Sequence, residues 1–372
     1  MMLLVVALHA AVPYLAAPVP RLVWAVRDGA WGRVLDGVFW ACRGVAVPAF
    51  LVMAGMVAAG AIARRGPGSF AWSRLRRVGG ALAAGLVTVL PVVYLVWLWG
   101  LTRTGRARPR HVLHGRFERG IEPELYGFAH LWYLEYLLLF AMAFAGVAWV
   151  ARRMRLERGV GGIARWTVGA PWGAALLVPI TAWTLWRWPE AFFAFRNTAI
   201  PQAGMAAYHA AFFAAGAAMW AARGRIGVPT RGWSAWLLAA AVAFGGMFWL
   251  MDGRAETGPA WGPRWVAWCA AAYTWCSVMG WLGACGRLRS VPRGVGWLAR
   301  ASYLMYVVHL PFVTVVQVAM HGSGVHPGVK WAMATGAGLA GGVGTAWVLE
   351  RAGRWWRGTG GLIGATDLPS GG

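Results

Sequence analysis

The segment MLLVVALHAAVPYLAA, residues 2–17, is an apolar run that contains a single ionisable side chain, His9. Its other side chains suit lipid or packed helices, whereas an imidazole is costly to bury in a bilayer. An ionisable residue within a membrane span is therefore a functional-site hypothesis. The alternative is a histidine that bonds to a neighbouring helix or lies near the lipid headgroups. Because the run lacks a basic leading region, we interpret it as a retained span rather than a signal peptide.

The composition of the whole chain indicates a membrane protein. Of its 372 residues, 59% are hydrophobic and 13% are charged, whereas a soluble domain has about 25% charged residues. Apolar runs of about 20 residues recur along the chain, as in polytopic α-helical membrane proteins. The alternation typical of a transmembrane barrel is absent. We therefore predict an all-α fold, a bundle of about ten transmembrane helices.

The apolar segments predict where these helices lie. They cover residues 1–17, 38–62, 79–100, 129–150, 171–189, 203–222, 233–251, 264–284, 297–319 and 329–350. No domain boundary interrupts them, so residues 1–350 form one membrane domain. Residues 351–372 are a basic and then Gly-rich tail that we predict to be disordered. In the last segment, the spacing of Gly338 and Gly342 favours close helix packing.

The net charge of +23 is best explained by membrane topology. Loops that face the cytoplasm in an arrangement with both termini inside carry most of the arginine, as the positive-inside rule requires. The exception is the loop 101–128, which we predict to be an external surface that attracts anions; its arginines are Arg103, Arg106, Arg108, Arg110, Arg116 and Arg119. No basic patch interleaved with aromatic residues supports nucleic-acid binding, and the four cysteines form no CxxC pair that would indicate a metal site.

Several other costly polar side chains lie within the predicted spans. Arg43 and Glu135 must face a protein interior or a wet cavity, and for each the alternative role is an ion pair between helices. Tyr306 and His309 share one helical face, shortly before Pro311, which frees a backbone carbonyl group. Together these spans predict a buried polar chamber. Its further candidates are His130, His209 and Gln317.

The side chains of this chamber suit direct group transfer. The sequence contains no Gly-rich phosphate loop, HExxH or GxSxG motif. An imidazole can act as general base on an incoming hydroxyl group, and an arginine or tyrosine can stabilise the resulting oxyanion. The alternative is a transporter or flippase for an anionic or lipid-linked glycan. Such proteins usually contain paired repeats with broken helices, and the sequence shows none.

Several motifs together resemble those of the acyltransferase-3 family of integral-membrane O-acyltransferases. The resemblance covers residues 1–350 and is closest to the branch that contains the succinyltransferase of osmoregulated periplasmic glucans. The motifs are His9, Arg43, VPAFLVMAG at residues 47–55, WSRLRR at 72–77, HLWYL at 130–134 and SYLMYVVHLP at 302–311.

The resemblance implies an enzyme of the inner (cytoplasmic) membrane with acyl-CoA as its donor. It would move an acetyl or succinyl group from cytoplasmic acyl-CoA to a hydroxyl group of an extracytoplasmic glycan, without a metal ion. By the same resemblance, His9 and Arg43 are catalytic. The residues expected to line the substrate pocket are His130, Glu135, Tyr306 and His309. Those expected at the CoA phosphates are Arg74, Arg76 and Arg77, for which the alternative is a topology signal alone.

The sequence departs from the family pattern at two places. The arginine that relatives carry about ten residues before the first-span histidine would precede Met1, so we expect the natural start to lie upstream. Ala54 replaces the usual serine before Gly55, which removes a hydroxyl group but keeps a small side chain. A catalytically inactive relative that serves as an assembly partner is a further alternative, favoured by the missing arginine.

Overall fold

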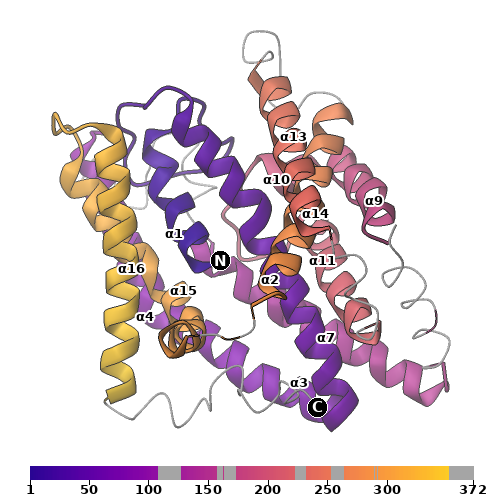
Figure 1. Ribbon diagram of the computed structural model, residues 1–372. Coiled ribbons are helices and arrows are strands. Elements are labelled where there is room, and N and C mark those ends of the chain that lie inside the picture. The colour runs from indigo at the N-terminus through magenta and orange to yellow at the C-terminus, as the bar shows by residue number, and fades with distance from the viewer. Residues whose placement is uncertain are drawn as a thin grey trace.

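All regular structure in the described part of the chain is helical (Figure 1), which confirms the predicted fold class. The computed structural model describes residues 1–107, 127–156, 162, 173–222, 232–252, 264–288, 290 and 292–351. The predicted tail beyond residue 351 and most of the arginine-rich loop, including Arg108, Arg110, Arg116 and Arg119, lie outside these residues.

Each predicted apolar segment corresponds to one helix, and the described chain adds the short elements η1, α3, η2, η3 and α10. Their bounds are α1 (Met2–Ala11), η1 (Val12–Tyr14), α2 (Val34–Arg65), α3 (Pro67–Arg74), η2 (Leu75–Gly79), α4 (Gly80–Arg103), η3 (Ala129–Leu131), α7 (Trp132–Arg153), α9 (Gly173–Arg187), α10 (Glu190–Phe193), α11 (Ala203–Ala221), α13 (Trp233–Asp252), α14 (Arg264–Cys285), α15 (Arg293–Met320) and α16 (Pro327–Arg351).

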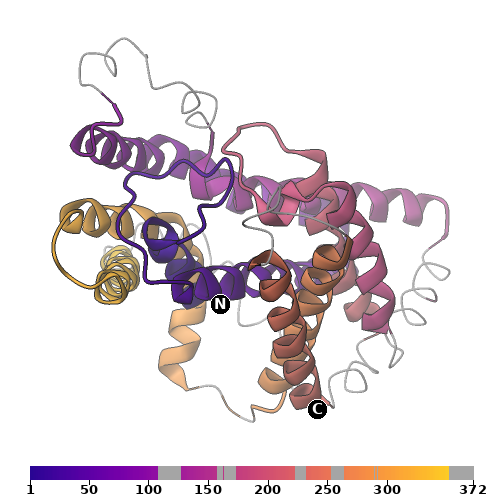
Figure 2. The same cartoon turned by 90° about the horizontal axis from the view of Figure 1, so that it is seen from above.

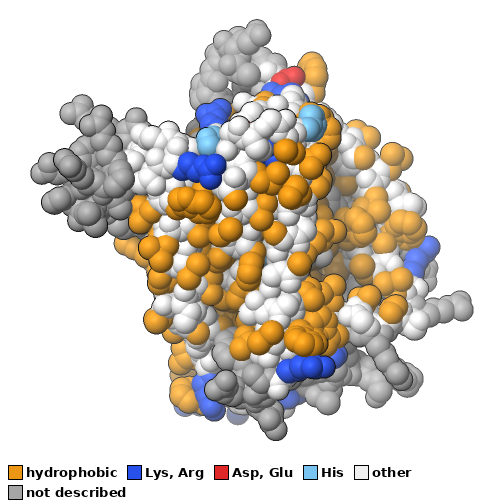
Figure 3. All heavy atoms as spheres, turned by 90° about the vertical axis from the view of Figure 1, so that its left-hand side faces the viewer, with side chains coloured by type: hydrophobic (Ala, Val, Ile, Leu, Met, Phe, Trp, Pro, Cys, Tyr) orange, Lys and Arg blue, Asp and Glu red, His pale blue; other side chains and the backbone are white. Residues whose placement is uncertain are grey.

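The protein is a multi-pass membrane protein. Within the described residues, six helices are long and apolar enough to cross a bilayer: α2, α3 continued through α4, η3 with α7, α13, α15 and α16. On the face around α16, hydrophobic side chains form a broad band, with lysine and arginine side chains above and below it (Figure 3). Val87 and Leu95 of α4 and Val348 of α16 are exposed on the outside of the bundle, as lipid contact requires. The count of ten crossings and the cytoplasmic termini stay predictions.

The short helix α1 lies at the centre of the bundle. It packs against α2, α15 and α16, and Val6, Ala10 and Ala11 are fully buried in those contacts. Seen from above, this indigo helix and α2 lie between the yellow C-terminal helices and the red-orange helices α13 and α14 (Figure 2). His9 is therefore carried into the protein interior and not toward lipid.

Glycines allow the neighbours of α1 to approach closely. A Cβ on Gly338 of α16 would lie 2.6 Å from Val313 and 2.7 Å from Val6, and one on Gly342 would lie 3.2 Å from Met305. The predicted close packing along this face of α16 is confirmed. It holds α16 against both α15 and α1.

A close helix crossing joins α2 to α11. A Cβ on Gly55 would lie 2.0 Å from the carbonyl oxygen of Phe213, and one on Gly216 would lie 1.9 Å from that of Val52. The two backbones are therefore in direct contact, with no room for a side chain at either glycine. This crossing fixes the position of α2, the helix that carries Arg43.

We expect Gly55→Ala to destabilise the protein, because the added methyl group would force α2 and α11 apart. Overpacking of this kind costs about 1–3 kcal/mol or more, so the unfolding midpoint of the purified protein in detergent should fall by several degrees. The control is Gly37→Ala in the same helix, where a Cβ meets no atom within 4 Å and alanine is the better helix former. Equal midpoints for the two variants would show that the crossing is not tight.

Candidate active site

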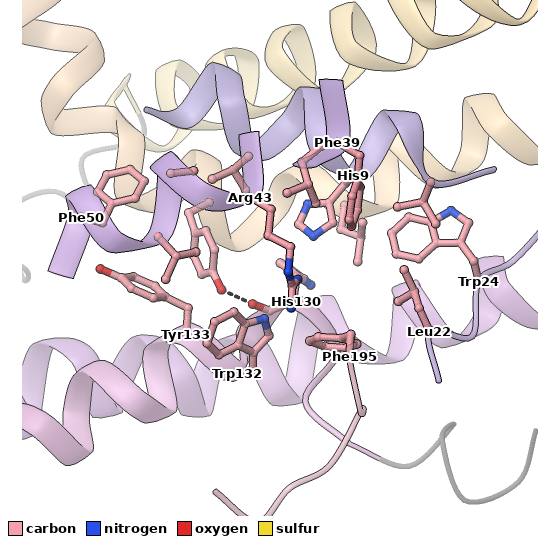
Figure 4. A pocket seen from close by; sticks show the side chains of 18 of the residues that line it. His9, Leu22, Trp24, Phe39, Arg43, Phe50, His130, Trp132, Tyr133 and Phe195 are labelled. Atoms are coloured by element: carbon pink, nitrogen blue, oxygen red, sulfur yellow. Dashed lines mark hydrogen bonds between the residues drawn. The ribbon is translucent and has the colours of Figure 1, made fainter. Parts of the chain in front are cut away.

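A cavity of about 80 Å³ lies where α1, α2, α7 and α15 meet. Four of the predicted site residues line it: His9, Arg43, His130 and Tyr306. Figure 4 shows Arg43 extending from α2 into the space between His9, His130 and Trp132. The remaining wall is apolar and combines aliphatic with aromatic side chains, the latter including Trp24, Phe39, Phe50, Trp97, Tyr133 and Phe195. We call this cavity the chamber.

His309 does not line the chamber, but it determines which ring nitrogen of His9 carries the proton. The side chain of His309 is fully buried, and its Nδ1 lies 2.7 Å from the carbonyl oxygen of Tyr306. Because a carbonyl oxygen only accepts hydrogen bonds, this Nδ1 carries the proton, and Nε2 of the neutral ring is an acceptor. Nδ1 of His9 lies 2.9 Å from that Nε2 and therefore donates to it. The network leaves Nε2 of His9 unprotonated, with no partner among the described residues.

The backbone of His9 is held by a second side chain of α15. Pro13 has no N–H group, so the carbonyl oxygen of His9 lacks its usual helical partner. The Gln317 amide nitrogen donates to this oxygen at 3.0 Å and to that of Ala10 at 3.1 Å. The Gln317 oxygen accepts a hydrogen bond of 2.9 Å from the indole of Trp24, whose ring stacks on His9 with centroids 5.9 Å apart. His9 is thus held in position and in ring plane.

Pro311 leaves a backbone carbonyl group of α15 without its helical donor, as Pro13 does for His9. It leaves the oxygen of Val307 without a helical N–H donor, and Nε2 of His130 donates to that oxygen at 2.8 Å. The predicted effect of Pro311 is confirmed, and its partner is His130. The Tyr306 hydroxyl donates to the His130 carbonyl oxygen, the dashed bond in Figure 4. Nδ1 of His130 is buried without a partner in the described chain, so it is a second acceptor at the chamber.

Backbone carbonyl groups hold the guanidinium group of Arg43, in place of the ion pair that was its alternative role. Nε donates to Phe192 at 2.5 Å and one Nη donates to Ala194 at 2.8 Å. These two oxygens lie at the end of α10 and just after it. The other Nη makes no hydrogen bond to a described residue, and the side chain lines the chamber. Arg43 therefore presents an unused, rigidly aimed donor to whatever occupies the chamber.

Comparison with known proteins identifies the family. A family model described as an acyltransferase domain matches residues 1–351. The chain belongs to the acyltransferase-3 family. The protein is therefore a membrane acyltransferase, and the chamber is its candidate active site. No curated protein and no solved structure matches the chain.

Two larger cavities of the acyltransferase adjoin the chamber. One of about 480 Å³ lies at the start of α1, is lined by Met1, Arg74 and Arg300, and shares Phe50, Tyr133 and Tyr306 with the chamber; we call it the Arg74 cavity. The other, of about 250 Å³, lies past the end of α1 and is lined by Arg27 and Arg106; we call it the Arg106 cavity. Its residues in common with the chamber are Val12, Leu22 and Trp24.

The predicted site residues differ in which of the three cavities they line. Arg74 lines the cavity named after it, whereas Arg76 and Arg77 line none of the three. Glu135 also lines none of them. Arg300, which precedes the SYLMY motif, lines the Arg74 cavity and was missed. Among the described residues, no group of three or more His, Cys, Asp or Glu is placed to hold a metal ion.

We expect Arg43→Lys to lose at least 90% of the acyl-transfer rate. A lysine ammonium cannot bond two carbonyl groups through a planar fork and also keep a third donor aimed at the chamber. One buried carbonyl oxygen left unpaired costs about 1–3 kcal/mol, so the unfolding midpoint should fall slightly. The measurement is acyl transfer by purified protein, alongside thermal unfolding. A fully active lysine variant would mean that Arg43 contributes only its positive charge and not the geometry of its guanidinium group.

Proposed function

We propose that this acyltransferase moves an acetyl or succinyl group from acyl-CoA to a hydroxyl group of an extracytoplasmic glycan, with His9 as the general base. The observation that carries the proposal is the unprotonated Nε2 of His9 at the chamber, set by its bond to His309. The chamber adjoins one cavity at each end of α1. The site of action would be the inner (cytoplasmic) membrane, on the predicted topology.

The Arg74 cavity fits the donor. On that topology it faces the cytoplasm, and the arginines at its wall, Arg74 and Arg300, offer the planar donors that phosphate groups bind. The rest of its wall is mostly apolar, including Phe50, Val78 and Leu137, which suits the acyl-bearing arm of CoA. The thioester carbonyl would then reach the chamber past Phe50, Tyr133 and Tyr306.

The reaction follows from the groups that surround the chamber. His9 Nε2 takes the proton of the acceptor hydroxyl group as its oxygen attacks the thioester carbonyl carbon. The free Nη of Arg43 donates to the oxyanion of the tetrahedral intermediate. When the intermediate collapses, the C–S bond breaks and the CoA thiolate receives the proton from His9. An ester and free CoA are formed, and His9 returns to its starting tautomer.

His130 and Tyr306 act beside this centre. With its Nε2 proton bonded to Val307, His130 offers Nδ1 as an acceptor to a donor group of either substrate. Tyr306 uses its hydroxyl proton to hold the His130 backbone, so its role is to keep that ring in place. Neither residue is needed to balance the proton transfer.

We expect His9→Ala to abolish acyl transfer while leaving membrane insertion and the unfolding midpoint nearly unchanged. Loss of the general base alone removes about 10²–10⁴-fold of the rate. The measurement is mass spectrometry of envelope glycans from cells that express wild-type or variant protein, in which the acyl mass increment should vanish. The control is His326→Ala, an exposed histidine outside the three cavities, which should keep the increment. An active His9→Ala protein would remove His9 from the mechanism.

We expect His309→Gln to keep more activity than His309→Leu, because a glutamine oxygen can still accept the proton of His9 Nδ1. The leucine variant leaves that tautomer undefined, so its turnover number should fall at least tenfold further than that of the glutamine variant, with little change in the KM for acyl-CoA. Its pH–rate profile should also change, because His9 then titrates without a fixed partner. Identical losses in both variants would mean that His309 serves packing alone.

A further inference from the structure

The Arg106 cavity is a separate compartment whose ligand the reaction itself does not specify. Its wall is apolar along η1 and the following loop, where Leu15, Pro18 and Val19 contribute. Two arginines, Arg27 and Arg106, are its charged residues. Its volume of about 250 Å³ is roughly eight times the share of one water molecule in the liquid. The cavity therefore has room for a polar group of considerable size.

Among the described residues, the cavity wall contributes no carboxylate that would cancel the charge of the two arginines. Asp28, next to Arg27 in the chain, bonds instead to Lys330 at 2.7 Å. Partial burial raises the pKa of Asp28, but hydrogen bonds from Lys330 and the Gly29 amide outweigh it, so the pKa stays below its usual value. The carboxylate is thus ionised and paired with Lys330.

Arg106 is also tied to the catalytic chamber. One Nη of Arg106 donates to the carbonyl oxygen of Trp24 at 3.2 Å, and the ring of Trp24 stacks on His9. Trp24 lines both the chamber and the Arg106 cavity. A molecule that places a hydroxyl group at His9 and extends past Trp24 therefore brings its next substituents to Arg106 and Arg27.

We propose that the Arg106 cavity binds an anionic substituent, a carboxylate or a phosphate, of the glycan that receives the acyl group. The inference rests on the proposed function. A guanidinium group is the side chain best matched to these two anions, because its planar donors bind both oxygens at once. On the predicted topology the cavity opens at the extracytoplasmic face, where the acceptor arrives.

The experiment uses glycans from cells that lack the gene, separated by anion exchange into a neutral and an anionic pool. Purified full-length protein and radiolabelled acyl-CoA are supplied with each pool in turn. We expect the label to enter the anionic pool. Phosphatase treatment of that pool should abolish labelling if the anion is a phosphate monoester, and chemical amidation should abolish it if the anion is a carboxylate. Labelling of the neutral pool alone would overturn the proposal.

Variants test whether the two arginines are responsible. The double variant Arg27→Gln/Arg106→Gln should raise the KM for the anionic pool on the order of tenfold, with the KM for acyl-CoA unchanged. The matched control is Arg264→Gln, an exposed arginine at the start of α14 outside the cavity, which should leave both values unchanged. An unchanged KM in the double variant would overturn the proposal. An equal rise in the KM for neutral acceptors would also overturn it, because that result is expected if the two arginines bind a lipid headgroup. Equal labelling by His9→Ala protein would contradict the proposed function instead.

Discussion

The chamber depends on backbone carbonyl groups that lack a helical hydrogen-bond donor. In a bilayer every polar backbone group needs a partner within the protein, so a proline inside a span creates an acceptor that some side chain must satisfy. Pro13 exposes the carbonyl of His9 to Gln317, and Pro311 exposes that of Val307 to His130. Arg43 uses two further carbonyls where α10 ends. Apart from His9, whose ring bonds to that of His309, the polar side chains of the site are therefore anchored to main chain.

This way of anchoring the side chains decides their chemistry. A carbonyl oxygen can only accept, so each histidine bonded to one must place its proton there and present its other nitrogen as an acceptor. His309 Nδ1 then donates to the Tyr306 carbonyl oxygen, and His9 Nδ1 donates to His309 Nε2. This leaves Nε2 of His9 as a basic nitrogen at the chamber. An ion pair would have given an imidazolium or a neutralised arginine instead. Preorganised neutral bases and one aimed cation are what acyl transfer requires.

The sequence predicts the helices well, because a bilayer-spanning helix is encoded by one continuous apolar run. It also predicts that His9, Arg43, His130, Glu135, Tyr306 and His309 share one chamber, because charged and imidazole side chains are too costly to face lipid. It does not predict which neighbour each side chain meets. Glu135 lines none of the three cavities, and Trp24, which stacks on His9, lies in a loop without periodicity. Arg300 resembles any other positive-inside residue, so only its place at the Arg74 cavity distinguishes it from Arg76 and Arg77.

The arrangement of the cavities bears on how a reaction can join substrates that lie on opposite sides of a membrane. A CoA molecule carries several charges, and moving even one charge to the bilayer centre costs at least about 2.5–3.5 kcal/mol. The chamber is small and its wall is mostly apolar, so it admits an acyl group and a hydroxyl group but not the phosphate groups of CoA. Under the proposed function those phosphates stay at Arg74 and Arg300 on one side, and the anionic substituent of the acceptor stays at Arg27 and Arg106 on the other. Only the acyl group then changes sides, and neither carrier needs to cross.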